Sequence, residues 1–160
     1  MSGGVYELGR FHYTTGVAGI SKDTWLNIAS QLATARQESR EVAVVCIGTD
    51  CSTGDSLGPL VGSMLTKNNM ANVFGTLSSP IHFGNLEESV EAVYNELNNP
   101  FIIAVDAALG KQKSIGQIVI KMGGLLPGEG INRVAPFAVG DISVTGVVNE
   151  AGFMEYFVLQ

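Results

Sequence analysis

The sequence predicts an α/β fold of three layers, in which a mostly parallel central sheet carries helices on both faces. Two continuous apolar runs, at 42–47 (VAVVCI) and 101–105 (FIIAV), are rich in β-branched residues. Such runs are typical of strands that are buried on both faces. Helical patterns alternate with them, which favours right-handed crossovers between parallel strands. With 160 residues, we expect one domain over 1–160.

The composition excludes several classes of protein. Hydrophobic residues make up 46% and charged residues 15% of the chain, which excludes a disordered protein. The net charge is −6 and the sequence has no cluster of Lys or Arg, so we expect no nucleic-acid partner. No apolar run approaches the roughly 20 residues that span a bilayer, and the first ten residues do not resemble a signal peptide. We therefore expect a cytoplasmic protein with no membrane partner.

The first part of the chain predicts an arm, a helix and a strand. Residues 1–20 contain five glycines and no clear period, so an irregular N-terminal arm is expected. A helix should start with Ser21 as its N-cap, because apolar residues recur at helical spacing from Trp25 to Ala35. The buried strand at 42–47 follows.

A loop over 49–54 then leads to a second helix. Pro59 has no N–H and is harmless only in the first turn of a helix, so Asp55 is the expected N-cap. A short strand is predicted at 73–77.

A third helix should start at Asn85, because Glu88 three residues later completes a pattern like that of a capping box. Further strands are predicted at 115–120 and 142–148. The segment 123–136 is rich in Gly and Pro and is expected to be a long, functional loop.

The last residues, 149–160, carry an apolar helical stripe that ends abruptly. Such a stripe favours burial against a partner, so self-association into a homo-oligomer is one expectation.

Acidic residues follow both buried strands. Asp106 comes directly after 101–105, and Asp50 and Asp55 come after 42–47. Ligands of open parallel sheets bind beyond the C-terminal ends of the strands, and neighbouring strands lie only about 4.8 Å apart. We therefore expect these carboxylates to meet in a site.

Two close carboxylates share a proton, bind a metal, or hold a water between them. A shared proton gives general acid–base catalysis, and a metal gives Lewis-acid chemistry. In the metal case, His82 could join Asp55 and Asp106 as a ligand. The structural alternatives are a helix N-cap for Asp55 and a turn cap for Asp106.

Two other motifs are weaker. The loop from Gly48 to Gly54 departs from the phosphate-binding P-loop in its glycine spacing and lacks the Lys-Ser/Thr that follows. Gly-Asp-Ser-Leu at 54–57 matches the signature of the GDSL esterases, with Ser56 as nucleophile. That mechanism needs a histidine base in Asp-x-x-His, and neither His12 nor His82 has this context. A Ser56 esterase is therefore a minor alternative.

Three motifs carry a resemblance to a known family: Asp-Ser-Leu-Gly-Pro at 55–59, Asp-Ala-Ala-Leu at 106–109 and Val-Gly-Asp-Ile-Ser-Val-Thr-Gly at 139–146. The chain resembles the sporulation proteins related to the spore germination protease. The resemblance implies that Asp55 and Asp106 match essential aspartates of that protease. More distantly, the chain is similar to the hydrogenase maturation proteases, which implies a phosphorylase/hydrolase-like fold. The matching carboxylates of those proteases bind nickel together with a later histidine, and this chain has no histidine after position 82.

The leading hypothesis is a peptidase-like hydrolase of sporulating bacteria, in which the two aspartates activate water against a peptide bond. Its partner would be a peptide or protein substrate, and no cofactor is expected, although a divalent metal remains open. Further residues are expected to shape the cleft: Asp50, Ser56, His82, Asn85 and Thr145. The alternative is a non-catalytic sporulation protein that binds a peptide, a small ligand or a metal in the same cleft.

Overall fold

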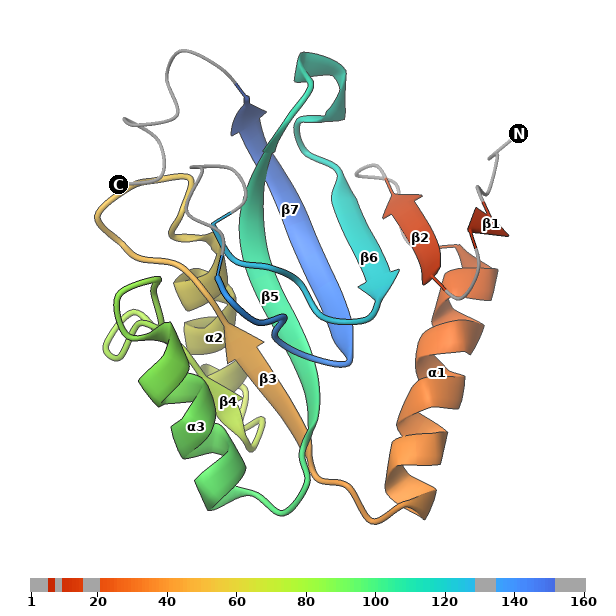
Figure 1. Ribbon diagram of the computed structural model, residues 1–160. Coiled ribbons are helices and arrows are strands. Elements are labelled where there is room, and N and C mark those ends of the chain that lie inside the picture. Colours follow the sequence, from red (N-terminus) through yellow and green to blue (C-terminus); the bar gives the residue numbers. More distant parts are fainter. Residues whose placement is uncertain (1–5, 8–9, 16–20, 129–134, 152–160) are drawn as a thin grey trace.

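The computed structural model describes residues 6–7, 10–15, 21–128 and 135–151. Seven strands form one sheet in the order β1-β2-β6-β7-β5-β3-β4 (Figure 1). The strands are β1 Tyr6–Glu7, β2 Arg10–Thr15, β3 Val42–Cys46, β4 Val73–Phe74, β5 Phe101–Gly110, β6 Ile118–Met122 and β7 Ile142–Glu150. The helices are α1 Lys22–Gln37, α2 Leu57–Lys67, α3 Leu86–Glu96 and the short 3-10 helix η1 Gln112–Ser114.

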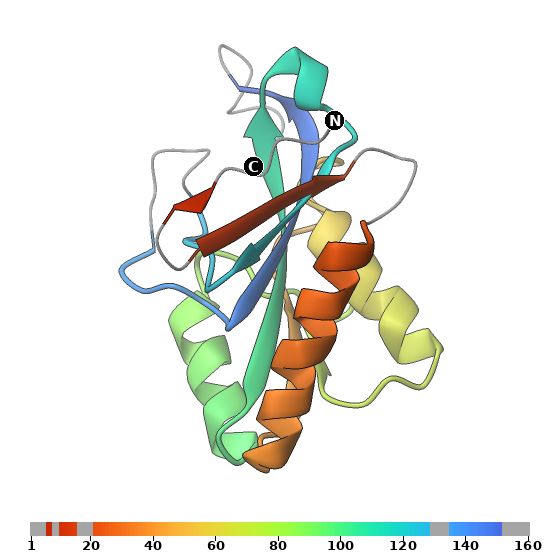
Figure 2. The ribbon, with the colours of Figure 1, turned by 90° about the vertical axis from the view of Figure 1, so that its right-hand side faces the viewer.

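The sheet is mostly parallel, as predicted. The four neighbouring strands β4, β3, β5 and β7 pair in parallel. The strand β6 is antiparallel to β7, and β2 is antiparallel to β6, so β2 runs in the common direction again. Helices α1 and α2 cover one face of the sheet and α3 covers the other (Figure 2). The predicted three-layer α/β fold is therefore confirmed.

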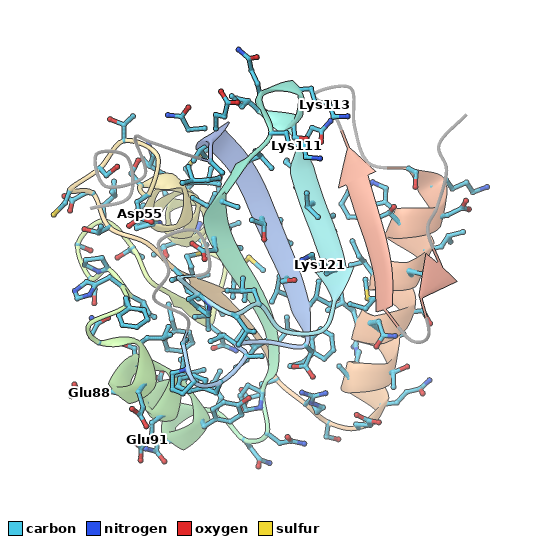
Figure 3. All side chains as sticks on the ribbon, turned by 45° about the horizontal axis from the view of Figure 1, so that its top comes forward. Asp55, Glu88, Glu91, Lys111, Lys113 and Lys121 are labelled. Atoms are coloured by element: carbon cyan, nitrogen blue, oxygen red, sulfur yellow. The ribbon has the colours of Figure 1, made fainter. Side chains whose placement is uncertain are left out.

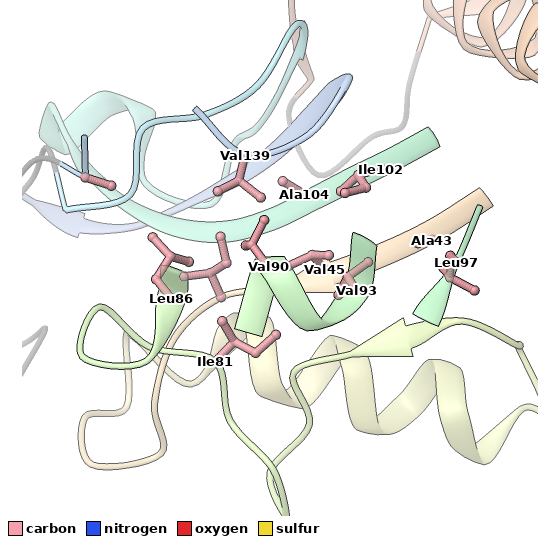
Figure 4. Packing of buried hydrophobic residues seen from close by; sticks show 12 residues of the cluster. Ala43, Val45, Ile81, Leu86, Val90, Val93, Leu97, Ile102, Ala104 and Val139 are labelled. Carbon is pink, nitrogen blue, oxygen red and sulfur yellow. The ribbon is translucent and has the colours of Figure 1, made fainter. Parts of the chain in front are cut away.

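Alternation along the central strands explains the two layers of core. On one face, Val45 of β3 and Ile102 of β5 pack against Val90 and Val93 of α3 (Figure 4). The residues that alternate with these along each strand point to the opposite face of the sheet, towards α1 and α2. Cys46, for example, packs beneath α2. Successive strand residues point to opposite sides, so both faces must be apolar. The continuous apolar runs therefore become the centre of the sheet.

Helix α2 lies unusually close to the backbone of the sheet. A Cβ atom on Gly58 would overlap the carbonyl group of Ile47, and one on Gly62 would overlap the carbonyl oxygen of Gly75. The two glycines are four residues apart and therefore lie on one side of the helix. Their missing side chains allow the helix to rest directly on the chain that leaves β3 and β4.

The N-terminal expectation was partly wrong. The segment 1–20 is not wholly irregular, because β1 and β2 lie within it and extend the sheet beyond β6. Ser21 is the N-cap of α1, as predicted, and its hydroxyl accepts a hydrogen bond from the N–H of Thr24 (3.2 Å). Trp25, by contrast, is 56% exposed, so the apolar stripe of this helix does not bury its first member.

Other boundaries also moved. The short strand expected at 73–77 ends at Phe74, and the strand expected at 115–120 is β6, which starts three residues later. Residues 149 and 150 belong to β7 and not to a helix, while 152–160 lie outside the described residues. The described part of 123–136 contains no helix or strand, and a bridge between Leu125 and Val139 ties it to the chain that follows.

We predict that Gly58→Ala and Gly62→Ala each destabilise the protein by roughly 1–3 kcal/mol, because the added methyl group forces the helix away from the sheet. In a solvent-exposed helix, Gly→Ala stabilises by about 1 kcal/mol. The sign of the change in the free energy of unfolding therefore shows whether the helix contacts the sheet backbone. The measurement is urea unfolding followed by circular dichroism. Met64→Ala, at a position 64% exposed on the same helix, is the control. Unchanged stability in both glycine variants would contradict the close approach.

Candidate functional site

The two aspartates lie where the connections of the sheet diverge. After β3 the chain passes through α2 to β4, at one edge of the sheet. After β5 it turns to β6 and β7, on the other side of β5. Because β3 and β5 are parallel neighbours, with Cys46 opposite Val105, their C-terminal ends form a topological switch point. This is the place where open α/β sheets bind ligands.

Asp106 lies inside β5 and not after it, which corrects the sequence-based expectation. The strand continues to Gly110 because its pairing with β7 continues beyond the apolar run, and Asp106 is directly opposite Thr145. Asp106 is two residues from Ala104, which packs in the α3 cluster, so its side chain points to the α3 face. The N–H of Ala107 donates a hydrogen bond to the carboxylate (2.8 Å). A strand holds this group more rigidly than a turn would.

Asp55 lies in the loop between β3 and α2, and it is not the N-cap of that helix. The N-cap position is Ser56, whose side chain makes no capping bond, and Pro59 is the third residue of the helix. The Asp55 carboxylate instead accepts a hydrogen bond from the N–H of Thr49 (2.9 Å). Gly48 makes this turn possible, because its φ is +140° and a Cβ there would overlap the carbonyl oxygen of Asp55.

Burial raises the pKa of Asp106 to about 8, with a smaller contribution from the negative charge of Asp55 and against the opposing effect of the Ala107 N–H. The pKa of Asp55 is also raised by burial, while the Thr49 N–H and the His82 side chain lower it. The environments of the two acids therefore differ. Asp106 keeps its proton near neutral pH, and Asp55 is the member of the pair that ionises more readily.

His82 and Asn85 belong to one braced segment beside Asp55. Ile81 forms a parallel bridge with Ile47, which carries the segment along the end of β3. The Asn85 side chain accepts a hydrogen bond from the N–H of His82 (2.8 Å) and donates one to the carbonyl of Pro80 (3.0 Å). Asn85 is the N-cap residue of α3 but makes no side-chain capping bond, so the expected capping box does not form.

The remaining predicted residues occupy different places. Asp50 is exposed in the loop after β3, and Thr145 is on β7 opposite Asp106. The Ser56 hydroxyl donates a hydrogen bond to the carbonyl of Thr53 (2.7 Å). The fold therefore brings Thr145 to the pair directly, while Asp50 and Ser56 lie in the loop and turn that precede α2.

No nucleophile–base pair forms around Ser56. Its hydroxyl is bonded to a backbone carbonyl, and Nδ1 of His82 accepts the N–H of Gly84 (3.1 Å). His12 is on β2, which β6 and β7 separate from β5 by roughly 14 Å. The hydrogen bonding therefore disfavours the esterase alternative.

The conditional metal site is not assembled either. Within the described ranges, no three His, Cys, Asp or Glu residues come close enough to hold a metal ion. His82 acts on Asp55 through its charge, but Asp55, Asp106 and His82 do not converge as three ligands. Asp55 and Asp106 interact with each other through charge, which raises the pKa of Asp106.

Three features of the site had no signal in the sequence. The N–H of Thr49 holds Asp55, and Leu57 of α2 lies against Gly146 of β7, where a Cβ would meet its side chain. Ser143, on the same face of β7 as Thr145, is fully buried, and its hydroxyl has no hydrogen-bond partner. The Leu57–Gly146 contact joins segments far apart in the sequence, and the other two features depend on backbone conformation and burial, so no local pattern could reveal them.

The fold and the site define a three-layer α/β protein with a carboxylate pair at the switch point of its sheet. The chain belongs to the family described as protein of unknown function DUF1256, whose model matches residues 19–160. It is 50% identical over 123 residues to "Uncharacterized protein YyaC" of Bacillus subtilis (strain 168), a match that covers 76% of this chain and 60% of that protein. This chain therefore aligns with less than two thirds of the relative's length. No helix among the described residues is long and apolar enough to cross a membrane.

We predict that Asp106→Asn stabilises the protein at high pH. The native state holds the Asp106 proton from pH 3.8 up to about 8, so raising the pH through this window removes stability from the wild-type protein. Asparagine carries no charge and keeps the acceptor for the Ala107 N–H. The expected gain at pH 9 is at least about 1 kcal/mol, or roughly 2–4 °C in Tm, and it shrinks towards pH 4. The measurement is thermal unfolding across this range.

The matched control is Asp50→Asn, which also removes one carboxylate but at an exposed position. Its effect on Tm should not grow between pH 4 and pH 9. Equal pH dependence in both variants would show that Asp106 is not the group that resists ionisation.

Proposed function

We propose that the protein is a peptidase-like hydrolase in which Asp55 and Asp106 together activate a water molecule against a peptide bond. The observation that carries this proposal is the pairing of a proton-holding carboxyl with a more readily ionised one at the switch point of the sheet. Catalytic acid–base pairs are distinguished by environments that push their pKa values apart. The resemblance of the motifs around both aspartates to those of the germination protease supports the same assignment.

In this mechanism, the Asp55 carboxylate accepts a proton from water while the water oxygen adds to the peptide carbonyl carbon. Asp106 donates its proton to the carbonyl oxygen, which gives a neutral tetrahedral intermediate. Asp55 then passes its proton to the leaving nitrogen as the C–N bond breaks, and Asp106 recovers a proton from the hydroxyl group that becomes the new carboxyl oxygen. The pair ends with one proton on Asp106, as it began.

The neighbouring groups support these roles. The Thr49 N–H fixes one oxygen of Asp55 and leaves the other free for water. Thr145, opposite Asp106 on the same face, offers a hydroxyl for the substrate backbone. The described part of the 123–136 loop, exposed Asp50 and braced His82 would border the bound chain. As part of this proposal, the protein acts on a polypeptide in the cytoplasm of sporulating cells.

We predict that Asp55→Asn and Asp106→Asn each lower peptide hydrolysis by at least about 100-fold, because each removes one of the two proton transfers. The measurement is cleavage of a mixed peptide library, read by mass spectrometry. Asp23→Asn, at an exposed position in the first turn of α1, is the matched control and should retain activity. Circular dichroism must show that all three variants fold. Turnover retained in both site variants would refute the mechanism.

We predict a bell-shaped dependence of kcat/KM on pH. Activity should fall above about pH 8, where Asp106 loses the proton that it donates. It should also fall in acid, where Asp55 becomes protonated, at a pH above the ordinary value of 3.8 because burial raises its pKa. The apparent pKa values of the two limbs belong to the coupled pair of aspartates and not to either residue alone. An activity that keeps rising to pH 10 would contradict the role of Asp106 as acid.

A further inference from the structure

The charges of this acidic chain are sharply divided along the sequence. Residues 68–110 contain five acids and no Lys or Arg. Residues 107–128 contain Lys111, Lys113 and Lys121 and no Asp or Glu. Neither stretch contains a long run of like charges, and the lysines are too dispersed to form a cluster in the sequence. The fold determines where these charges lie relative to the two aspartates.

Two of the three lysines, Lys111 and Lys113, lie on a projection at the end of β5, the strand that carries Asp106. Strand β5 continues four residues beyond Asp106 to Gly110, and η1 then turns the chain back into β6. We call this projection, residues 110–118, the basic arm. In Figure 3, Lys111 and Lys113 lie at its tip, on the opposite side of the β5 end from Asp55. Strand β6 then carries Lys121 away from the tip.

The basic arm has no internal partner for its charge. Lys111, Lys113 and Lys121 are exposed, and none of them forms an ion pair with another described residue. The only acid on the paired strand at this level is Glu150, an exposed residue opposite Gly110. Within the described part of the chain, Arg40 and Asp141 form an ion pair at the other end of the sheet. Among the described residues, the charges of Lys111 and Lys113 are therefore left for a ligand.

The arm also presents apolar surface. Ile115 and Ile118 are each 43% exposed, on either side of the turn into β6. A surface that combines unpaired lysines with exposed aliphatic side chains suits a polypeptide that carries both acidic and apolar residues. A nucleic acid fits less well, because its phosphates would lie beside Asp55 and the acidic residues of α3 in a chain of net charge −6.

We propose that the basic arm is an exosite that binds an acidic segment of the polypeptide substrate, outside the bond that is cleaved. The inference rests on the proposed function in that it assumes a polypeptide crosses the aspartate pair. It also assigns an orientation to the bound polypeptide. The acidic segment lies over Lys111 and Lys113, and the part of the substrate that crosses towards α3 is neutral or basic, facing Glu88 and Glu91 (Figure 3).

The test uses the full chain carrying Asp106→Asn, so that the probe is not cleaved. Fluorescence anisotropy measures the binding of three labelled peptides of one sequence, with Glu, Gln or Lys at a central cluster of positions. We expect the Glu peptide to bind roughly tenfold more tightly than the Gln peptide, and the difference to shrink with added salt. Lys111→Glu with Lys113→Glu should abolish the preference. Lys67→Glu, at the exposed end of α2, is the control and should preserve it.

The outcomes separate the two proposals. If Glu and Gln peptides bind equally, or if Lys67→Glu has the same effect as the arm variant, the exosite is refuted even where wild-type protein cleaves peptides. If the arm-dependent preference appears but wild-type protein cleaves nothing, the exosite stands and the hydrolase fails. A single-stranded oligonucleotide that binds the arm more tightly than the Glu peptide overturns the assignment of the partner.

Discussion

The direct contact of α2 with the backbone at the ends of β3 and β4 is the constraint on which the site depends. Gly58 and Gly62 remove the side chains that would separate the helix from Ile47 and Gly75. The helix start, and with it the loop that carries Asp55, is thereby pressed against the end of the sheet. A helix separated from the sheet by ordinary side chains would leave Asp55 further from β5 and in water. The glycines of this motif therefore serve the geometry of the acid pair as much as the packing.

The electrostatic consequence is an unequal pair of acids. Asp106 is held within a strand in the middle of the sheet, so desolvation dominates and its proton is retained. Asp55 sits in a loop where one backbone N–H and the side chain of His82 favour its charge. The negative charge of Asp55 also disfavours the ionisation of Asp106. The asymmetry is a property of the two elements, a strand and a loop, that hold the two carboxyl groups.

Prediction from the sequence succeeded where burial alone decides structure. The runs at 42–47 and 101–105 became the central parallel strands, because continuous apolar sequence fits only a sheet covered on both faces. It failed where pairing with a distant segment decides. The residues that follow the second run, Asp106 to Gly110, remain in β5 because β7 lies beside them. The N-terminal strands have no core pattern of their own and form by pairing, β2 with β6 and β1 with β2.

The sequence by itself determined the layered fold and the choice of Asp55 and Asp106, because strand burial and the carboxyl ends of parallel strands follow from local pattern and general topology. Tertiary structure decided what kind of pair they are. Whether an acid is desolvated, which N–H it accepts and which charges face it depend on how the chain folds around it. For Asp55 these groups are the N–H of Thr49 in its own loop and the side chain of His82, which lies 27 residues further along the chain. The same holds for the basic arm: its lysines are scattered in the sequence, and only the turn from β5 into β6 sets them beside the acids.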